Sequence, residues 1–419
     1  MAKFIIEGGQ RLKGEIKVGG MKNAATPILA STLLISENCL LKNLPNITDV
    51  KTMIEILKSL GSKIEFLEEH VIKINNENVS LQSLDKILIK KMRSSILLMG
   101  PLLAKFGQVE IPEPGGCIIG NRPIDSHLYA LEKLGAKIEK ENDFYGLKTK
   151  GLEGAEIVLP EFSVTATENA IMAAVLAKGK TIIKLAAAEP HVQDLCNFLN
   201  KAGAKISGIG THTLEIQGVK KLNGVEHTII PDQIEVGTLA VIATLNRGEI
   251  LIKDIIPEHL DIILLKLKEI GVIFELKGNS IKVYHTANLK AFNLQTLPYP
   301  GFPTDLQAPF GVLATQCQGT SLIKDPMYEG RLGYIQELIK MGANAIIADP
   351  HRVIITGPTP LYGQEIKSFD LRAGATLIIA GMIAQGITII NDAQLVDRGY
   401  EKLDERLNKL GAKIKRINE

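Results

Sequence analysis

The chain has 419 residues, of which 45% are hydrophobic and 22% charged, and its formal net charge is +2. This length exceeds one ordinary core, so two or more domains are expected, and the small net charge gives no general reason to expect nucleic-acid or membrane binding. No stretch offers about 18 uninterrupted apolar residues, and the first residues hold too short an apolar run for a signal peptide. We therefore expect a cytoplasmic protein. Four cysteines, none in CxxC spacing, favour neither a disulfide framework nor a zinc site.

A short phrase of the form Leu-Gly-Ala-Lys-Ile recurs along the chain at intervals of 68 to 74 residues. This regularity indicates an internal repeat. An amphipathic helix is predicted before each phrase, as in residues 49–60 and 400–410, with the glycine as its C-terminal stop. A short strand such as residues 63–66 is predicted after it. The six glycines are Gly61, Gly135, Gly203, Gly271, Gly342 and Gly411.

Each repeat also contains a helix rich in small and apolar residues, followed by a strand. These helices carry so few charges that they must be buried on nearly all sides. A unit of this size cannot form a core alone, so six units fit two globular halves of three. The predicted helices are 25–34, 93–106, 167–178, 236–247, 306–318 and 372–385. The predicted strands are 39–42, 108–111, 180–183, 249–252, 320–323 and 387–390.

Polar residues stand at the starts of these buried helices. Ordinary capping could account for Asp305 and Asp370. Lys22 and the arginines at such starts oppose the helix dipole, so we interpret them as contacts to an anionic ligand. The chain has only ten arginines against 38 lysines, and five of the ten lie next to glycine or at a helix start. Guanidinium groups suit phosphate and carboxylate oxygens. The five are Arg93, Arg122, Arg331, Arg372 and Arg398.

The loop of residues 112–127 holds the candidate nucleophile, Cys117. Its glycines and prolines rule out a regular helix and allow close ligand approach. A structural cysteine is the alternative, which fits the apolar surroundings of the other three cysteines. Arg122 and the Gly115-Gly116 amides could lower the pKa of the Cys117 thiol, so the pattern favours a chemical role.

Several separated motifs carry a family resemblance. They are Gly20-Met21-Lys22-Asn23-Ala24, Pro114 to Cys117 with Arg122-Pro123, Phe302 to Gln307, Glu329-Gly330-Arg331 and Asp397 to Glu401. Over essentially its whole length the chain resembles the UDP-N-acetylglucosamine enolpyruvyl transferases, also called UDP-N-acetylglucosamine 1-carboxyvinyltransferases. The resemblance implies an inside-out α/β barrel fold, with six βαβαββ-type repeats in two similar domains of three. Residues 22–229 would form the domain with the mobile Cys loop, residues 1–21 plus 230–419 the other, and the active site would lie in the cleft between them.

The implied reaction transfers the enolpyruvyl group of phosphoenolpyruvate to the 3-hydroxyl of UDP-N-acetylglucosamine and releases phosphate, the first committed step of peptidoglycan synthesis. No metal, organic cofactor or obligate protein partner is implied. By resemblance, Cys117 is the general acid, can form a covalent adduct with phosphoenolpyruvate, and predicts sensitivity to fosfomycin. Asp305 contacts the attacking sugar hydroxyl and could take its proton.

The resemblance assigns further residues to each substrate. Lys22 and Arg398 would be catalytic as well as phosphoenolpyruvate-binding, as positive charges that offset the anions of the transition state. The phosphoenolpyruvate contacts would be Lys22, Asn23, Arg122 and Arg398. The UDP-N-acetylglucosamine contacts would be Asn23, Arg93, Arg122, Pro123, Ile124, Asp125, Ser126, His127, Ser163, Val164, Asp305 and Met327. Cleft support would come from Arg331, Asp370 and Arg372.

Three positions depart from the family pattern. Glu161 stands where several members have lysine, Thr165 where glycine is usual, and Gln233 where arginine often follows Pro-Asp. These departures bear on the nucleotide contacts around residues 161–165 and not on the chemistry.

Three other functions are alternatives to this one. An enolpyruvyl transferase acting on shikimate phosphate shares the fold but does not use the Cys117 loop. A non-catalytic paralogue that binds the nucleotide sugar would not need Lys22, Cys117, Asp305 and Arg398 together. A relative that processes RNA ends would be expected to be more basic.

Overall fold

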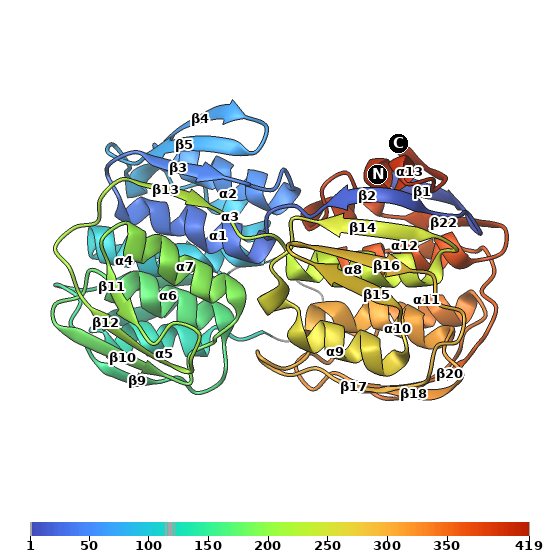
Figure 1. The fold of residues 1–419 in the computed structure, drawn as a ribbon. Helices are drawn as coiled ribbons and strands as arrows, with labels where there is room; N and C mark the ends of the chain where they lie inside the picture. Colours follow the sequence, from blue (N-terminus) through green and yellow to red (C-terminus); the bar gives the residue numbers. More distant parts are fainter. Residues whose placement is uncertain (1, 114, 116–119, 121, 419) are drawn as a thin grey trace. The chain divides into compact units, whose positions relative to one another are not determined.

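The computed structural model describes residues 2–113, 115, 120 and 122–418 as an α/β protein with two compact units (Figure 1). Unit 1 contains the described residues up to Gly19, Gly120 and those from Pro231 onward. Unit 2 contains those from Gly20 up to the Cys loop and from Arg122 to Ile230. Among the described residues, no helix combines the length and apolar character that crossing a bilayer requires.

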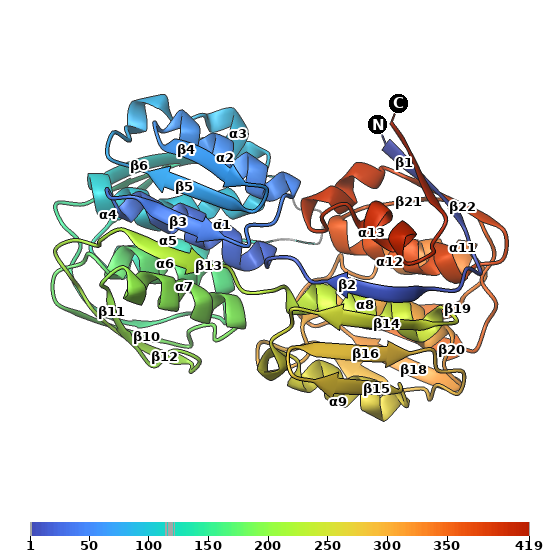
Figure 2. The same cartoon turned by 45° about the horizontal axis from the view of Figure 1, so that its top comes forward.

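Unit 2 contains three small sheets; Figure 1 labels strands of two of them, and Figure 2 labels strands of all three. The first has the order β13 (Val225–Thr228), β3 (Cys39–Lys42), β5 (Val71–Asn75), β4 (Lys63–Glu68). The second has the order β6 (Gln108–Pro112), β8 (Phe144–Lys148), β7 (Lys137–Glu141). The third has the order β9 (Glu156–Val158), β10 (Lys180–Lys184), β12 (Thr213–Gln217), β11 (Lys205–Ser207).

Unit 1 repeats this plan. Its first sheet has the order β2 (Lys13–Lys17), β14 (Glu249–Lys253), β16 (Ser280–Tyr284), β15 (Phe274–Lys277). The second has the order β17 (Asn293–Gln295), β18 (Gly319–Lys324), β20 (Arg352–Gly357), β19 (Asn344–Asp349). The third has the order β21 (Glu365–Lys367), β22 (Ile387–Asn391), β1 (Ala2–Glu7), β23 (Ile414–Asn418). The first and last strands of the chain therefore pair in one sheet.

In five of the six sheets the first pair of strands is parallel and the other pairs are antiparallel. A parallel pair needs a crossover connection, and a buried helix supplies it, as α6 (Val164–Ala174) does between β9 and β10. Two strands are exchanged: β2 precedes the first buried helix but pairs in unit 1 with β14, whereas β13 pairs in unit 2 with β3. In the sheet of three strands, α3 (Lys86–Lys90) packs against β6.

The buried helices lie where the sequence predicts them. In unit 2 they are α1 (Lys22–Ser31), α4 (Met99–Phe106) and α6, and in unit 1 they are α8 (Gln233–Leu245), α10 (Gln307–Thr315) and α12 (Leu371–Ile383). The helices α1, α6 and α8 begin three residues before their predicted starts. For α1 and α8 the prediction began at the apolar run, but the polar residues before the run form part of the first turn. Short 3-10 turns extend three of them: η1 (Thr32–Leu34), η3 (Arg93–Leu98) and η5 (Thr304–Leu306).

The amphipathic helices end as predicted at the repeated glycine. All six of these glycines have left-handed φ values, from 94° to 109°. A residue with a Cβ is strained there, which explains why glycine recurs. The predicted helix 400–410 starts later, at Leu403, because Lys402 has a left-handed φ of 44°, which does not fit a right-handed helix. The helices are α2 (Thr48–Ser59), α5 (Asp125–Lys133), α7 (Pro190–Lys201), α9 (Asp261–Ile270), α11 (Tyr334–Lys340) and α13 (Leu403–Lys409), and the remaining 3-10 turns are η2 (Leu81–Ser83), η4 (Pro257–His259) and η6 (Ala393–Arg398).

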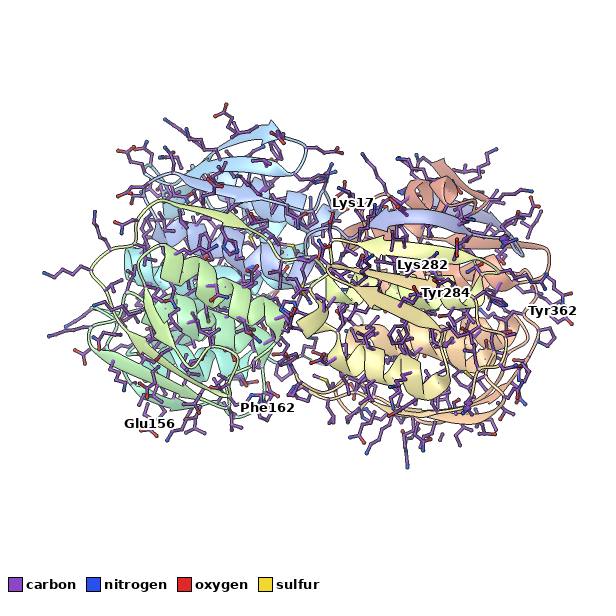
Figure 3. The ribbon with its side chains drawn as sticks, in the orientation of Figure 1. Lys17, Glu156, Phe162, Lys282, Tyr284 and Tyr362 are labelled. Atoms are coloured by element: carbon purple, nitrogen blue, oxygen red, sulfur yellow. The ribbon has the colours of Figure 1, made fainter. Side chains whose placement is uncertain are left out.

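The outer faces of the sheets are exposed to solvent, and their polar side chains form ion pairs and hydrogen bonds with one another. On β16, Lys282 lies 3.1 Å from Glu249 of the neighbouring strand, and the Tyr284 hydroxyl donates to Glu275 at 3.0 Å (Figure 3). The alternate residues of the same strand, Ile281 and Val283, are fully buried. Each strand therefore buries one face against the central helices and exposes the other.

Candidate active site

Asp305 is the centre of a charged cluster in unit 1. It lies in η5, immediately before α10. Its Oδ1 is 2.6 Å from Nη2 of Arg331, and its Oδ2 is 3.1 Å from Nη2 of Arg372. The three side chains are 19%, 11% and 4% exposed, respectively. Two largely buried guanidinium groups therefore orient this carboxylate and stabilise its charge.

The two arginines remain charged although they are buried. Burial opposes the positive charge of Arg331, but Asp305 and Asp370 outweigh it and raise the pKa of that guanidinium. Burial likewise opposes the charge of Arg372, and its neighbours Tyr400 and Asp305 raise its pKa. Among the described residues, the Nε of Arg331 and the Nη1 of Arg372 are buried without a hydrogen-bond partner. The cluster therefore holds two N–H groups that an anion could satisfy.

A second carboxylate, Asp325, holds the surroundings of Asp305 in place. The Thr304 hydroxyl donates to its Oδ2 at 2.6 Å, and the Met327 backbone N–H donates to its Oδ1 at 3.1 Å. Gln307 donates to the Arg331 carbonyl oxygen at 3.1 Å. The predicted residue Met327 is thus tied to the turn that carries Asp305.

The two remaining predicted site residues of unit 1 are Asp370 and Arg398. Asp370 caps α12, since it accepts the N–H groups of Arg372 at 2.7 Å and Ala373 at 3.0 Å. This is the capping role that the sequence left open for it. Arg398 is the last residue of η6 and is half-buried.

In unit 2, Lys22 occupies the first turn of α1, next to Asn23. Its Nζ lies 2.8 Å from Oδ2 of Asp49, which is buried in the first turn of α2. Asp49 balances the positive charge of Lys22, and Asp305 balances that of Arg372. The interpretation of the cations at helix starts as ligand contacts is therefore incomplete, because carboxylates of the protein also pair with them.

Arg93 holds the C-terminal part of the Cys loop. Its Nη2 donates to the carbonyl oxygen of Arg122 and, at 3.5 Å, to that of Pro123. The start of the loop is held by a bond of 2.7 Å from the Glu113 N–H to the Asp143 carbonyl oxygen. The predicted nucleophile, Cys117, lies outside the described residues.

His127 is a buried, neutral member of a hydrogen-bond network. Its Nδ1 is 2.9 Å from Nδ2 of Asn169, which also donates to the Ile96 carbonyl oxygen. Since the Asn169 amide nitrogen can only donate, Nδ1 accepts and the ring proton sits on Nε2, which donates to the Thr165 hydroxyl at 3.0 Å. Burial, with smaller effects from Arg93 and Arg122, lowers the pKa of His127 to about 3. This side chain therefore positions its neighbours and carries no charge at neutral pH.

The residues around 161–165 are joined to the start of α5. Ser126 donates to the Glu161 carboxylate at 2.9 Å. Ser163 caps α6 by accepting the Ala166 N–H at 3.4 Å, so Val164 is the first residue of that helix. The two departures from the family pattern at Glu161 and Thr165 thus contact the predicted residues Ser126 and His127, which are preceded by Ile124 and Asp125.

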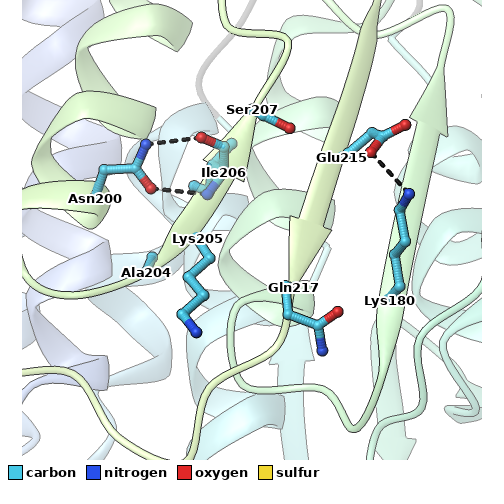
Figure 4. A pocket seen from close by; sticks show the side chains of 8 residues that line it. All are labelled: Lys180, Asn200, Ala204, Lys205, Ile206, Ser207, Glu215 and Gln217. Carbon is cyan, nitrogen blue, oxygen red and sulfur yellow. Dashed lines mark hydrogen bonds and ion pairs between the residues drawn. The ribbon is translucent and has the colours of Figure 1, made fainter.

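A polar pocket of about 450 Å³ lies elsewhere in unit 2, beside β10, β11 and β12 (Figure 4). Asn200 bonds both the N–H and the carbonyl of Ile206, at 2.8 and 2.9 Å, and Lys180 pairs with Glu215 at 2.7 Å. No predicted site residue lines it. The two Asn200 bonds hold the short edge strand β11, and the Lys180–Glu215 pair joins β10 to β12. The lining residues are Lys180, Asn200, Ala204, Lys205, Ile206, Ser207, Glu215 and Gln217.

The structure thus joins Asp305, Arg331 and Arg372 in unit 1, and Arg93 with the Arg122–Pro123 segment in unit 2. Sequence reasoning missed Asp49 and Asp325, which hold Lys22 and the turn before Asp305. An acidic residue in the first turn of the predicted helix 49–60 was the available signal for Asp49, but a helix-capping role explained it equally well.

Comparisons with known proteins agree on one family. A family model described as EPSP synthase (3-phosphoshikimate 1-carboxyvinyltransferase) matches residues 6–407. UDP-N-acetylglucosamine 1-carboxyvinyltransferase 1 of Carboxydothermus hydrogenoformans is 46% identical over 418 residues, which cover 100% of this chain and 99% of that protein. The UDP-N-acetylglucosamine 1-carboxyvinyltransferase of Koribacter versatilis is 44% identical over 422 residues, covering 100% of this chain and 97% of that protein.

Solved structures show the same fold. The enolpyruvyl transferase NikO from Streptomyces tendae superposes with a TM-score of 0.90 at 22% identity, and 99% of each chain is covered. EPSP synthase from Acinetobacter baumannii superposes with a TM-score of 0.75 at 19% identity, and 100% of each chain is covered. At these identities the likeness concerns the fold alone.

Proposed function

Because the chain belongs to the UDP-N-acetylglucosamine 1-carboxyvinyltransferases of the enolpyruvyl transferase family, we propose that it transfers the enolpyruvyl group of phosphoenolpyruvate to the 3-hydroxyl of UDP-N-acetylglucosamine. The product would feed peptidoglycan synthesis, and with it cell-wall growth and division. Since phosphoenolpyruvate is a cytoplasmic metabolite, we place the reaction in the cytoplasm. No metal or organic cofactor enters the scheme.

The reaction proceeds by addition and elimination. The sugar O3 forms a bond to C2 of phosphoenolpyruvate while a proton is added at C3, and the hydroxyl proton leaves O3. A proton is then lost from C3, the C2–O bond to phosphate breaks, and inorganic phosphate departs. The protein must therefore accept a proton at O3, deliver one at C3, and neutralise the carboxylate and the phosphate of the substrate.

The observation that carries the proposal is the cluster of Asp305, Arg331 and Arg372. Asp305 is the proton acceptor for the sugar O3, since two guanidinium groups orient its carboxylate. The buried N–H groups of Arg331 and Arg372 that lack a partner among the described residues are suited to the carboxylate or phosphate of phosphoenolpyruvate. An unmet buried donor costs about 1–3 kcal/mol, which a bound anion would recover.

The other residues keep the roles that the resemblance implies. Cys117 delivers the proton to C3 and is the site of covalent addition of phosphoenolpyruvate and of fosfomycin. Lys22, Asn23, Arg122 and Arg398 contact phosphoenolpyruvate. The segment from Arg122 to His127 contacts the nucleotide sugar, with Arg93, Ser163, Val164 and Met327. In this scheme both units contribute to the reaction, and each is an inside-out α/β barrel of three repeats.

Release of phosphate tests the proposal. Purified protein should release phosphate from phosphoenolpyruvate only when UDP-N-acetylglucosamine is present, and mass spectrometry should show the enolpyruvyl ether. Shikimate 3-phosphate as acceptor should give no phosphate; the opposite preference would contradict the assignment. Binding of the nucleotide sugar without any phosphate release would indicate a non-catalytic paralogue.

Matched carboxylate variants test the role of Asp305. Asp305→Asn keeps the shape of the side chain but removes the proton acceptor, so kcat should fall by about 100-fold or more. Asp349→Asn is the control, because Asp349 is also a carboxylate that pairs with an arginine, Arg352, at 2.6 Å in the same unit. Equal activity of the two variants would remove Asp305 from the mechanism.

Fosfomycin tests the role of Cys117. Incubation with fosfomycin and UDP-N-acetylglucosamine should give a single covalent adduct by mass spectrometry, and Cys117→Ser should give none. Unmodified wild-type protein would overturn the assignment of the thiol.

A further inference from the structure

We propose that Tyr400 is a positioning residue for the reaction: anchored by its hydroxyl on Thr238, it holds Arg372 in the orientation that presents this guanidinium to Asp305. The inference rests on the proposed function, and it gives a task to a tyrosine that the resemblance leaves without one. All four residues belong to unit 1.

Tyr400 stacks on the buried arginine of the cluster. Its ring centre lies 5.2 Å from Cζ of Arg372, within the range of a cation–π contact. Tyr400 is 2% exposed and Arg372 is 4% exposed. Such a contact is stronger where water is excluded, so the ring stabilises the charge of the guanidinium.

The direction of the hydrogen bond to Thr238 follows from a proton count. The Oγ1 of Thr238 lies 2.9 Å from the Tyr400 hydroxyl and 2.9 Å from the Ile234 carbonyl oxygen. A carbonyl can only accept, so the single Thr238 proton is directed to Ile234. The Tyr400 hydroxyl must then donate to Thr238, and the lone pairs of the Tyr400 oxygen remain able to accept a hydrogen bond. The hydroxyl group is thereby locked in one rotamer.

The backbone next to Tyr400 prevents the ring from moving away from Arg372. A Cβ at Gly399 would lie 2.4 Å from Cδ1 of Leu371, so the chain at this point packs directly on the first turn of α12. Arg372 follows Leu371 in the same turn. The chain of contacts from Thr238 on α8 through Tyr400 and Arg372 to Asp305 therefore ties two buried helices to the turn that carries the proposed proton acceptor.

Tyr400 could instead be a core residue that only fills space, and kinetics separate the two roles. Tyr400→Phe keeps the ring and removes the anchor. If Tyr400 positions Arg372, kcat for phosphate release should fall by about tenfold while the KM of each substrate changes by less than about threefold. A tyrosine that only fills space would leave kcat unchanged for the folded protein and lower only the unfolding temperature.

Two threonine variants in helix α8 complete the test. Thr238→Val removes the acceptor of the tyrosine hydroxyl and should lower kcat by about threefold to tenfold. Thr244→Val is the control, since Thr244 donates to the Ala240 carbonyl oxygen at 2.8 Å in the same way and is equally buried, but does not contact the cluster. The double variant Tyr400→Phe with Thr238→Val should be no slower than the slower single variant, because the two changes break one interaction.

The outcomes distinguish this inference from the proposed function. Wild-type protein that releases no phosphate would contradict both. Active wild-type protein with wild-type kcat in Tyr400→Phe and Thr238→Val would refute the positioning role alone. If Tyr400→Phe fails to fold, the comparison of Thr238→Val with Thr244→Val decides, and equal kcat values in these two would overturn the inference.

Discussion

Gly237 is the position where a single methyl group should disturb the turn that carries Asp305. It lies inside α8, and a Cβ built on it would be 2.5 Å from Cδ1 and 2.8 Å from Cδ2 of Leu306. Leu306 is fully buried and directly follows Asp305. Gly237→Ala therefore forces the Leu306 side chain to move, and because this side chain is fully buried we expect part of the shift to reach the 3-10 turn.

Two opposing effects determine the change in stability. Alanine is favoured over glycine inside a helix by about 1 kcal/mol. Overpacking a filled core costs about 1–3 kcal/mol. We expect the overpacking to win, so the free energy of unfolding should fall by up to about 2 kcal/mol, and the thermal midpoint by about 2–4 °C per kcal/mol for a unit of this size.

The effect on catalysis should exceed the effect on stability. A shift of a reacting group by about 1 Å can reduce the rate by about 100-fold, so even a partial displacement of Asp305 should lower kcat by about tenfold. Thermal unfolding and phosphate release measure the two effects on the same samples. Gly237→Ala combined with Leu306→Val, which removes the two clashing methyl groups, should recover part of the lost kcat. A Gly237→Ala protein with unchanged midpoint and kcat would refute the argument that α8 determines the place of Asp305.

Further predictions concern buried charges and thiols. Asp49→Asn should lower the free energy of unfolding by about 3 kcal/mol, because it leaves Lys22 without its carboxylate partner. Glu226→Gln, which breaks the exposed pair of Glu226 with Lys42, should change it by less than about 1 kcal/mol. Urea denaturation measures both changes. The unfolded chain protonates His127 near pH 6.5 and the folded chain only near pH 3, so stability should decline as the pH falls through this range, and His127→Gln should weaken that slope. Burial raises the pKa of Asp232 to about 6, so the protonated carboxyl group contributes to the free energy of unfolding at low pH, and this contribution is lost as the pH rises from 3.8 to 6. Asp232→Asn keeps a cap for α8. This variant should be more stable than wild type at pH 7 and not at pH 4. Burial raises the pKa of three thiols to about 12, those of Cys39, Cys196 and Cys317. Iodoacetamide at pH 7.5 should therefore label one thiol, Cys117. More than one label would contradict the prediction.

The repeat and its elements could be derived from the sequence because they depend on local preferences. A helix ends where glycine adopts a left-handed φ, and a helix without charges must be buried, whatever lies far along the chain. Strand β3 accordingly has the predicted bounds, 39–42. The residue types and motifs also identified Asp305, Arg331 and Arg372 as candidates for binding anions.

Only the tertiary structure decided which of these residues contact one another. Asp305 is 26 residues from Arg331 and 67 from Arg372, and Thr238 is 162 residues from Tyr400. The exchange of β2 and β13 between the units is likewise absent from any local pattern. Such pairings arise when helices and strands pack together, and the free energy of a buried ion pair depends on the burial and orientation of both partners. The sequence by itself thus determined the repeating units and the chemistry of their side chains, whereas packing determined the carboxylate partner of each buried cation.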